Sequence, residues 1–285
     1  VRDVIIIDNA ARASLLSSGG GLLVRSGSAT VEGCLIEGNR SDLQGGGLAA
    51  EQGTLTVSRT LIADNSATGL GGGILLQDGT LTVQSCRVIG NAARERGGGV
   101  HIQGGTAALS NVVLAGNAAT GLEGEAGCEL QGEGGGLSSF GFDLTLTQCT
   151  FYRNRAECEG TGGGAVILLG TLRNCIFRAN EDATGMTLTA QLTPLTGDLD
   201  IDHSSIQGWD GEFGGGENTP ADPAFVDPVG PDGVPGTLDD DLRLGPASPC
   251  VDVGLGAALP ADALDLDDDG DVSEPLPLDL GELAR

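Results

Sequence analysis

Acidic residues near the end of the chain have the types and the spacing that bind a metal ion. Residues 265–274 read DLDDDGDVSE and begin with the D-x-D-x-D-G pattern that opens a calcium loop. The ligands would be one main-chain oxygen, of Asp271, and three carboxylates, those of Asp265, Asp267 and Asp269. The twelfth position is Leu276, where a bidentate Glu is expected. A structural Ca²⁺ site and a solvated acidic loop therefore both remain open.

Two other groups of carboxylates have a spacing that could serve chemistry. Asp239, Asp240 and Asp241 follow one another and lie close in sequence to Asp232, which makes a second candidate cation site. Further upstream, alternate residues are acidic in the stretch DLDID, at Asp198, Asp200 and Asp202. If Leu199 and Ile201 face inward, these three carboxylates line the outer face of one strand. They are the chain's candidates for catalysis, with a solvated face as the alternative.

The histidines and most of the cysteines are weaker candidates for chemistry than the carboxylates. The two histidines are far apart, and we expect structural roles for both: His101 on a strand and His203 in the inward phase of Leu199 and Ile201. Of the seven cysteines, four share one slot of a repeat and are expected as buried thiols: Cys34, Cys86, Cys149 and Cys175. A disulfide between Cys149 and Cys175 is conceivable, and Cys250 has no obvious partner.

Cys128 and Cys158 occupy equivalent loops of neighbouring repeats, and Cys128 lies in the insertion at 118–133 that breaks the period. We predict a disulfide between them. Such a bond favours an oxidising, extracytoplasmic location. Because the insertion is the one irregular loop, it is also a candidate binding edge.

A strict repeat must position these groups. Glycine triplets begin at residues 19, 45, 71, 97, 134 and 162, and an Asn closes each unit at residues 39, 65, 91, 117, 154 and 180. The usual interval is 26 residues, which indicates stacked supersecondary units. Within each unit apolar residues alternate, as in GGGILLQDGTLTVQSCRVIGN, which leaves room for three short strands and no helical window. Leucine-rich and calcium-binding nonapeptide repeats do not fit the register.

The sequence therefore predicts an all-β chain: a parallel β-helix over residues 1–210, of about seven to eight coils, followed by an irregular acidic cap over 211–285. Right-handed coiling is the default for parallel connections. Residues three and five before each Asn, such as Val88 and Cys86, should point inward and stack. The asparagines should adopt the left-handed corner bend and hydrogen-bond along the axis.

Composition limits the partners. The 285 residues carry a formal net charge of −26, and all 14 basic residues are Arg. Residues 181–285 hold 24 of the 40 acidic residues and 2 of the 14 basic ones, which marks a boundary near residue 181. This charge disfavours nucleic acid and anionic lipid as partners. No apolar stretch has the length of a membrane helix. The first residues already match the end of a repeat, so we expect the chain to begin within an array.

The repeat resembles a known family. GGGI…CRVIGN, GGGL…CTFYRN and GGAV…CIFRAN are similar to the paired G-G-A-[ILV] and F-x-x-N motifs of polymorphic outer-membrane protein repeats, within the superfamily that includes pectate lyases. The stretch from ADPAF to PCVDVG resembles the tail of large secreted bacterial β-helix proteins, which caps the open end of the helix. Its expected apolar plug comprises Ala224, Phe225, Val226, Leu242, Leu244 and Val251.

The resemblance implies a secreted or cell-surface stalk, adhesin-like, monomeric and without catalysis, that meets an extracellular glycan or a cell-surface partner. The alternative is a polysaccharide lyase or glycoside hydrolase acting on acidic glycans. The row Asp198, Asp200 and Asp202 is similar to the Ca²⁺-binding rows of β-helix lyases, which also need a Lys or Arg base; neighbouring coils could bring Arg173 or Arg178 near it. A third alternative, a non-catalytic carbohydrate-binding β-helix, would use exposed aromatics, and Trp209 and Tyr152 are the candidates.

Overall fold

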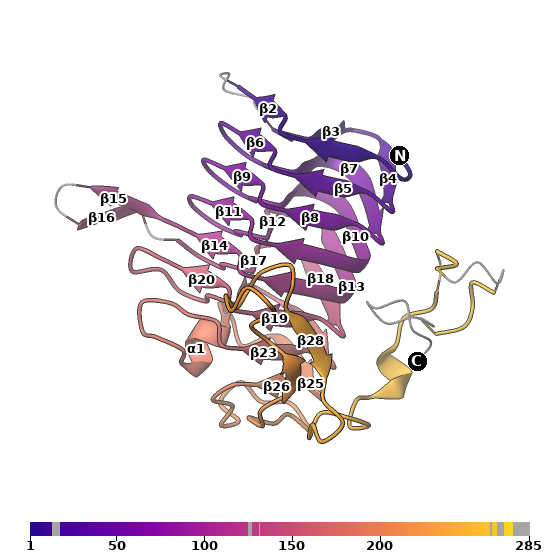
Figure 1. Cartoon of the computed structure of the whole chain (residues 1–285), viewed down its shortest axis with the longest axis vertical. Coiled ribbons are helices and arrows are strands. Elements are labelled where there is room, and N and C mark those ends of the chain that lie inside the picture. The colour runs from indigo at the N-terminus through magenta and orange to yellow at the C-terminus, as the bar shows by residue number, and fades with distance from the viewer. Residues whose placement is uncertain (13–17, 125–126, 131, 263, 267–270, 276–285) are drawn as a thin grey trace.

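The computed structural model describes residues 1–12, 18–124, 127–130, 132–262, 264–266 and 271–275. Over these residues the chain is all-β and winds as a parallel solenoid of about seven turns, as predicted (Figure 1). Successive coils pair in register at the predicted interval, so Ile36 pairs with Ile62 and Val88 pairs with Leu114. The alternating pattern thus folds into stacked coils, in which equivalent residues of neighbouring repeats lie above one another.

Three columns of parallel strands form the walls. The first contains β3 (Leu22–Arg25), β12 (Val100–Ile102), β17 (Leu137–Ser139), β21 (Ala165–Ile167) and β24 (Leu192–Pro194). The second contains β4 (Ser28–Glu32), β18 (Asp143–Thr147), β22 (Gly170–Arg173) and β25 (Leu199–Asp202). The third, called here the lateral face, contains β1 (Ile5–Ile7), β5 (Leu35–Glu37), β8 (Leu61–Ala63), β19 (Thr150–Tyr152), β23 (Ile176–Arg178) and β26 (Ser205–Ile206).

Longer strands bend around the corners between columns. They are β7 (Leu48–Ser58), β10 (Ile74–Ile89) and β13 (Thr106–Ala115), and each pairs with strands of more than one column. A separate ladder of two-residue strands runs beside them: β2 (Ala10–Ala11), β6 (Arg40–Ser41), β9 (Ser66–Ala67), β11 (Ala92–Ala93), β14 (Ala118–Ala119) and β20 (Arg155–Ala156).

The core is the stack of inward residues that the period predicts. Ile36, Ile62, Val88, Leu114, Phe151 and Phe177 form one column, and the next slot is filled by Cys34, Thr60, Cys86, Val112, Cys149 and Cys175. All of them are buried. The rings of Phe151 and Phe177 stack face to face on adjacent coils, with centroids 4.4 Å apart. Burial of these side chains is the main favourable term for folding.

The asparagines form a buried ladder along the axis. The Asn39 side chain donates to Asn65 Oδ1 over 3.0 Å, and Asn65 and Asn91 repeat the contact toward the next coil at 3.0 Å each. Each amide also donates to a carbonyl of the preceding coil, as Asn91 does to Ile62. The predicted hydrogen bonding along the axis is therefore confirmed.

The expected conformation of these asparagines is wrong. The left-handed bend falls on the residue before each of them, for example Asp64 (φ 53°) and Gly90 (φ 66°). The Asn side chain must point inward to meet its neighbours, so the corner itself is turned one residue earlier. The glycine triplets have a separate cause: a Cβ on Gly72 would lie 2.3 Å from the carbonyl oxygen of Gly98 on the next coil.

The last coil contains a helical turn within the predicted β-helix 1–210. Leu188–Gln191 form a short helix, α1, whose N-cap Thr187 accepts from the Ala190 amide. The helix places Gln191 against Asn180, whose side chain donates to Gln191 Oε1 over 2.9 Å. The longer Gln side chain thus takes the position of the next Asn and closes the ladder.

The C-terminal end of the core is covered by the segment that follows the last strand. Trp209 and Phe213 pack against the core, and residues 216–219 add parallel bridges to the final coil. The predicted apolar plug is wrong in part: Val226 and Val251 are 53% and 41% exposed. Phe225 and Leu242 instead pack on the lateral face, against a cluster around Tyr152.

Residues 222–262 and 264–266, called the strap, run back along the lateral face. They include an antiparallel pair, β27 (Phe225–Asp227) and β28 (Asp241–Leu244), and a 3₁₀ turn at Gly256–Ala258; β28 is labelled near β19 and β23 in Figure 1. The insertion at 118–133 forms a second antiparallel pair, β15 (Leu122–Gly124) and β16 (Gly127–Leu130), which projects from the body (Figure 1).

Candidate functional site

Two members of the predicted carboxylate row, Asp200 and Asp202, lie on β25 and contact nearby basic residues, whereas Asp198 precedes the strand. Arg173 of the preceding coil forms an ion pair with Asp200, and Asp202 Oδ2 lies 3.2 Å from His203 Nδ1. Arg178 pairs with Asp222 of the strap instead. The expectation that coil stacking brings Arg173 to the row is therefore confirmed. The row is an ion-paired surface in which Asp200 is already neutralised by its partner.

The tail carboxylates are used locally. Asp239 accepts from the Asp232 amide over 3.0 Å, and Asp241 forms an ion pair with Arg243 of the same strand. Asp265 and Asp271 of the predicted calcium loop are described, whereas Asp267 and Asp269 lie outside the described residues. Among the residues that are described, no three His, Cys, Asp or Glu side chains converge as metal ligands do. A calcium site in the loop 265–274 stays a prediction.

Five cysteines are free thiols: Cys34, Cys86, Cys149, Cys175 and Cys250. Cys149 and Cys175 are therefore not bonded to each other, although they lie on adjacent coils. Burial raises the pKa of the Cys86 thiol to about 12, as expected of an unreactive core thiol. The side chain of Cys128 lies outside the described residues, so its bridge to Cys158 stays a prediction.

The histidines and aromatics lie partly where expected. His101 is fully buried, and burial lowers its pKa to about 4. His203 is not inward: it takes a left-handed corner (φ 50°), and Ser204 fills the core slot. Of the two aromatics proposed for exposed carbohydrate stacking, Tyr152 is buried and Trp209 is partly buried against the core.

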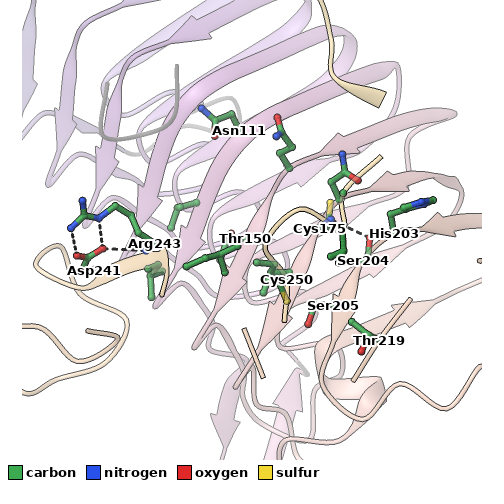
Figure 2. Close-up of a pocket in the computed structure, with 18 of the residues that line it drawn as sticks. Asn111, Thr150, Cys175, His203, Ser204, Ser205, Thr219, Asp241, Arg243 and Cys250 are labelled. Carbon is green, nitrogen blue, oxygen red and sulfur yellow. Dashed lines mark hydrogen bonds and ion pairs between the residues drawn. The ribbon is translucent and has the colours of Figure 1, made fainter. Parts of the chain in front are cut away.

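The described residues instead form a cleft of about 730 Å³ between the lateral face and the strap. Its floor comes from outward positions of successive coils: Val113, Thr150, Ile176 and Ser205. These residues alternate with inward core residues, which holds their side chains on the outer surface. Figure 2 shows Thr150 and Ser205 on this floor, with Asp241 and Arg243 on one side and His203 and Ser204 on the other.

One wall is a column of polar corner residues. The same corner of four successive coils is occupied by Asn111, Gln148, Asn174 and His203. Their φ angles lie between 50° and 55°. Asn tolerates this left-handed conformation best, because its short side chain can hydrogen-bond locally. Asn111 donates to Ser85 Oγ over 3.0 Å, which continues the column into the coil before. The cleft therefore presents amide or imidazole groups at one-coil intervals.

The other wall is the strap, and Asn174 anchors it. The Asn174 side chain donates to the Leu255 carbonyl (3.1 Å) and accepts from the Leu255 amide (2.7 Å). Further along, Arg87 donates to the Leu238 carbonyl over 2.8 Å. Arg87 lines the cleft with Asp240, and burial lowers its pKa while the Asp240 charge opposes that shift.

Sequence reasoning missed this cleft, although a signal for its corner wall was present. In successive repeats a polar residue directly precedes the inward position that Cys86, Cys149 and Cys175 fill. These polar residues are Arg59, Ser85, Asn111, Gln148, Asn174 and His203. Each of these residues follows another polar residue, as Ser85 follows Gln84, so two polar residues in a row interrupt the strict alternation and mark an outward corner. The strap wall gave no comparable signal.

No helix among the described residues is long and apolar enough to cross a membrane. Residues 1–119 match the family model for the right handed beta helix region. Neither the curated proteins nor the solved structures include a significant match to the chain. Together with the stacked parallel coils, the family match identifies the fold as a right-handed parallel β-helix. The narrower resemblance to polymorphic outer-membrane protein repeats remains a prediction.

Proposed function

We propose that this right-handed parallel β-helix is a secreted or cell-surface, adhesin-like stalk that binds a carbohydrate in its lateral cleft without cleaving it. The fold supports a structural or carbohydrate-related protein. The location, the adhesin role and the lack of catalysis are parts of the proposal.

The observation that carries the proposal is the repetition of polar groups along the cleft. The corner column places Asn111 and Gln148 at successive coils, beside hydroxyls such as Thr150. Stacked coils lie about 4.8 Å apart. A chain of sugar units lying along the axis would meet the same kind of donor and acceptor at each coil. Asn, Gln and Ser/Thr side chains provide both functions, as hydroxyl groups require.

The proposed role as a stalk is supported by the interactions that join neighbouring coils. Main-chain pairing, the apolar columns and the Asn ladder all run along one axis, so each coil is fixed by its neighbours. Such a rod resists bending better than a loop-linked array. It can hold a binding surface at a fixed distance from whatever carries it.

The ion pair between Arg173 and Asp200 weighs against the lyase alternative. A lyase of this kind would bind Ca²⁺ through the carboxylate row and keep its Arg free as the base. Here the guanidinium and the carboxylate satisfy each other, and Asp202 lies against His203. Binding a cation at this row would have to break both contacts.

The test is a panel of neutral and acidic polysaccharides, with binding measured by affinity electrophoresis and cleavage by release of unsaturated uronides. Thr150→Phe fills the cleft floor. Leu35→Phe is the matched control, because Leu35 holds the same outward register position in an earlier coil, outside the cleft. We expect binding by the wild type and by Leu35→Phe, loss in Thr150→Phe, and no uronide release. Uronide release, or binding that Thr150→Phe leaves intact, would overturn the proposal.

A further inference from the structure

Asp240 is a buried carboxylate in which described residues donate hydrogen bonds to one oxygen only. It immediately precedes β28 and is only 7% exposed. Its Oδ2 accepts from the main-chain amides of Gly236 (2.6 Å) and Thr237 (3.2 Å), which closes the loop before the strand. Its Oδ1 is also buried, and no described residue donates a hydrogen bond to it. A buried acceptor without a donor is costly, and native proteins rarely leave one without a reason.

The surroundings of Asp240 explain why it can stay there. Burial raises its pKa, and the nearby carboxylates of Asp239 and Asp232 raise it further, against the effect of the two amide donors. Arg87 supplies the opposing positive charge from β10 and is itself held by the Leu238 carbonyl. Asp240 and Arg87 both line the cleft. The loop amides therefore hold the carboxylate at the cleft, within the electrostatic reach of Arg87, while its second oxygen lacks a described donor.

The charges that line the cleft nearly cancel. Asp241 is paired with Arg243, and Asp240 is balanced by Arg87. Of the remaining charged lining residues, Glu217 carries a negative charge and lies near His203 at the far end. An anionic ligand would meet these carboxylates, and the two guanidinium groups among the described lining residues, Arg87 and Arg243, already face Asp240 and Asp241. A neutral ligand rich in hydroxyl groups would meet no charge repulsion from these carboxylates, and its hydroxyls could donate hydrogen bonds to Asp240 Oδ1.

We propose that Asp240 anchors a neutral saccharide at a subsite that the strap adds to the cleft, where binding uncovers Oδ1 and a sugar hydroxyl donates a hydrogen bond to it. The corner amide of Asn111 and the hydroxyl of Thr150 lie in the same cleft and would complete the polar contacts. This inference rests on the proposed carbohydrate-binding function and narrows it from glycans in general to uncharged ones. Hydrogen bonds to a charged group are the stronger kind, so the subsite should dominate affinity.

Asp240→Asn tests the anchor directly. The new amide oxygen can still accept from Gly236 and Thr237, whereas an NH₂ donor replaces the vacant acceptor. Asp239→Asn is the matched control: it makes the same chemical change one residue away, at an exposed carboxylate that does not line the cleft. Affinity for neutral oligosaccharides is measured by isothermal titration calorimetry at constant pH and salt. We expect a roughly tenfold loss for Asp240→Asn and less than about a twofold change for Asp239→Asn.

A measurement on the unmodified protein covers the case in which Asp240→Asn does not fold. Amide NMR shifts of Gly236 and Thr237 report on the carboxylate that they contact, and those of the buried Asn ladder serve as the reference. We expect a neutral saccharide to shift the first pair and leave the ladder unchanged. Unchanged Gly236 and Thr237 amides, unaltered affinity in Asp240→Asn, or binding of polyuronates alone would overturn this inference while the proposed function stands. If the wild type binds no saccharide, both fail.

Discussion

Replacement of Asn91 by Ala tests the ladder on which the stack depends. Asn91 is fully buried in the middle of the solenoid. Its Oδ1 accepts from both the main-chain amide and the side chain of Asn65 at 3.0 Å, and its Nδ2 donates to Asn117 Oδ1 and to the Ile62 carbonyl. Alanine removes all of these contacts and leaves their partner groups in the buried interior of the solenoid.

The cost follows from those bonds. The main-chain amide of Asn65 loses its acceptor, and a buried donor without a partner costs about 1–3 kcal/mol. The side-chain bonds to Asn65 and Asn117 contribute about 1 kcal/mol each. We therefore expect Asn91→Ala to lower the free energy of unfolding by roughly 3–5 kcal/mol.

The matched control is Asn9→Ala, at the exposed start of the same ladder. Asn9 donates to Asn39 Oδ1 over 2.9 Å, but water can replace that bond, so the loss should stay below about 1 kcal/mol. Urea unfolding followed by circular dichroism measures both, with the slope compared to confirm that the unfolding transition is the same. Equal losses for the two variants would refute the argument that burial makes the ladder important.

Three other predictions can be tested with the same protein. Burial lowers the pKa of His101 to about 4 from an ordinary value of 6.5, so the folded protein holds it neutral. The free energy of unfolding should therefore be greatest above pH 6.5 and fall by up to about 3 kcal/mol as the pH drops toward 4. Urea titrations across this pH range should show a flatter dependence in His101→Gln. If the loop 265–274 binds Ca²⁺, calcium raises the melting temperature and a chelator reverses the rise; an unchanged value identifies a solvated loop. If Cys128 and Cys158 are bridged, neither is alkylated in the unreduced, unfolded protein, and reduction lowers the melting temperature; alkylation of both rules the bridge out.

The columns of the solenoid were predictable because each depends on one side chain repeated at one interval. Inward Ile62 and Val88 need only an apolar residue between polar neighbours, and the Asn ladder needs an amide at each coil. The physical condition is local and is met again every 26 residues. The conformation of the corner was not predictable in this way, since Asp64 and Gly90 both satisfy it and share no side-chain property beyond tolerance of positive φ.

Prediction failed where the period ended. The alternation of residues 187–191 fits a strand, but the position that must be filled is the end of the Asn ladder, and a helical turn is what brings Gln191 to Asn180. His203 was misplaced for a similar reason. Its place after Leu199 and Ile201 suggested an inward side chain, whereas the corner interrupts the alternation at that residue and Ser204 resumes it. In both cases a tertiary contact overrides the local pattern.

The strap was the hardest part to place, because the solenoid holds several points of it through main-chain carbonyls, in addition to the side chains of Phe225, Leu242 and Asp222. Arg59 donates to the Leu266 carbonyl, Tyr152 to the Pro228 carbonyl and Asn174 to that of Leu255. Any residue offers a carbonyl, so these contacts impose no residue type on the strap and leave no pattern in its sequence. What the contacts do require is a side-chain donor on the solenoid, which Arg59 and Asn174 supply from the corner position and Tyr152 supplies from the end of β19. The same rule locates the candidate site: its specificity must come from the few strap side chains that face the cleft, of which Asp240 is the one buried there with an acceptor that no described donor satisfies.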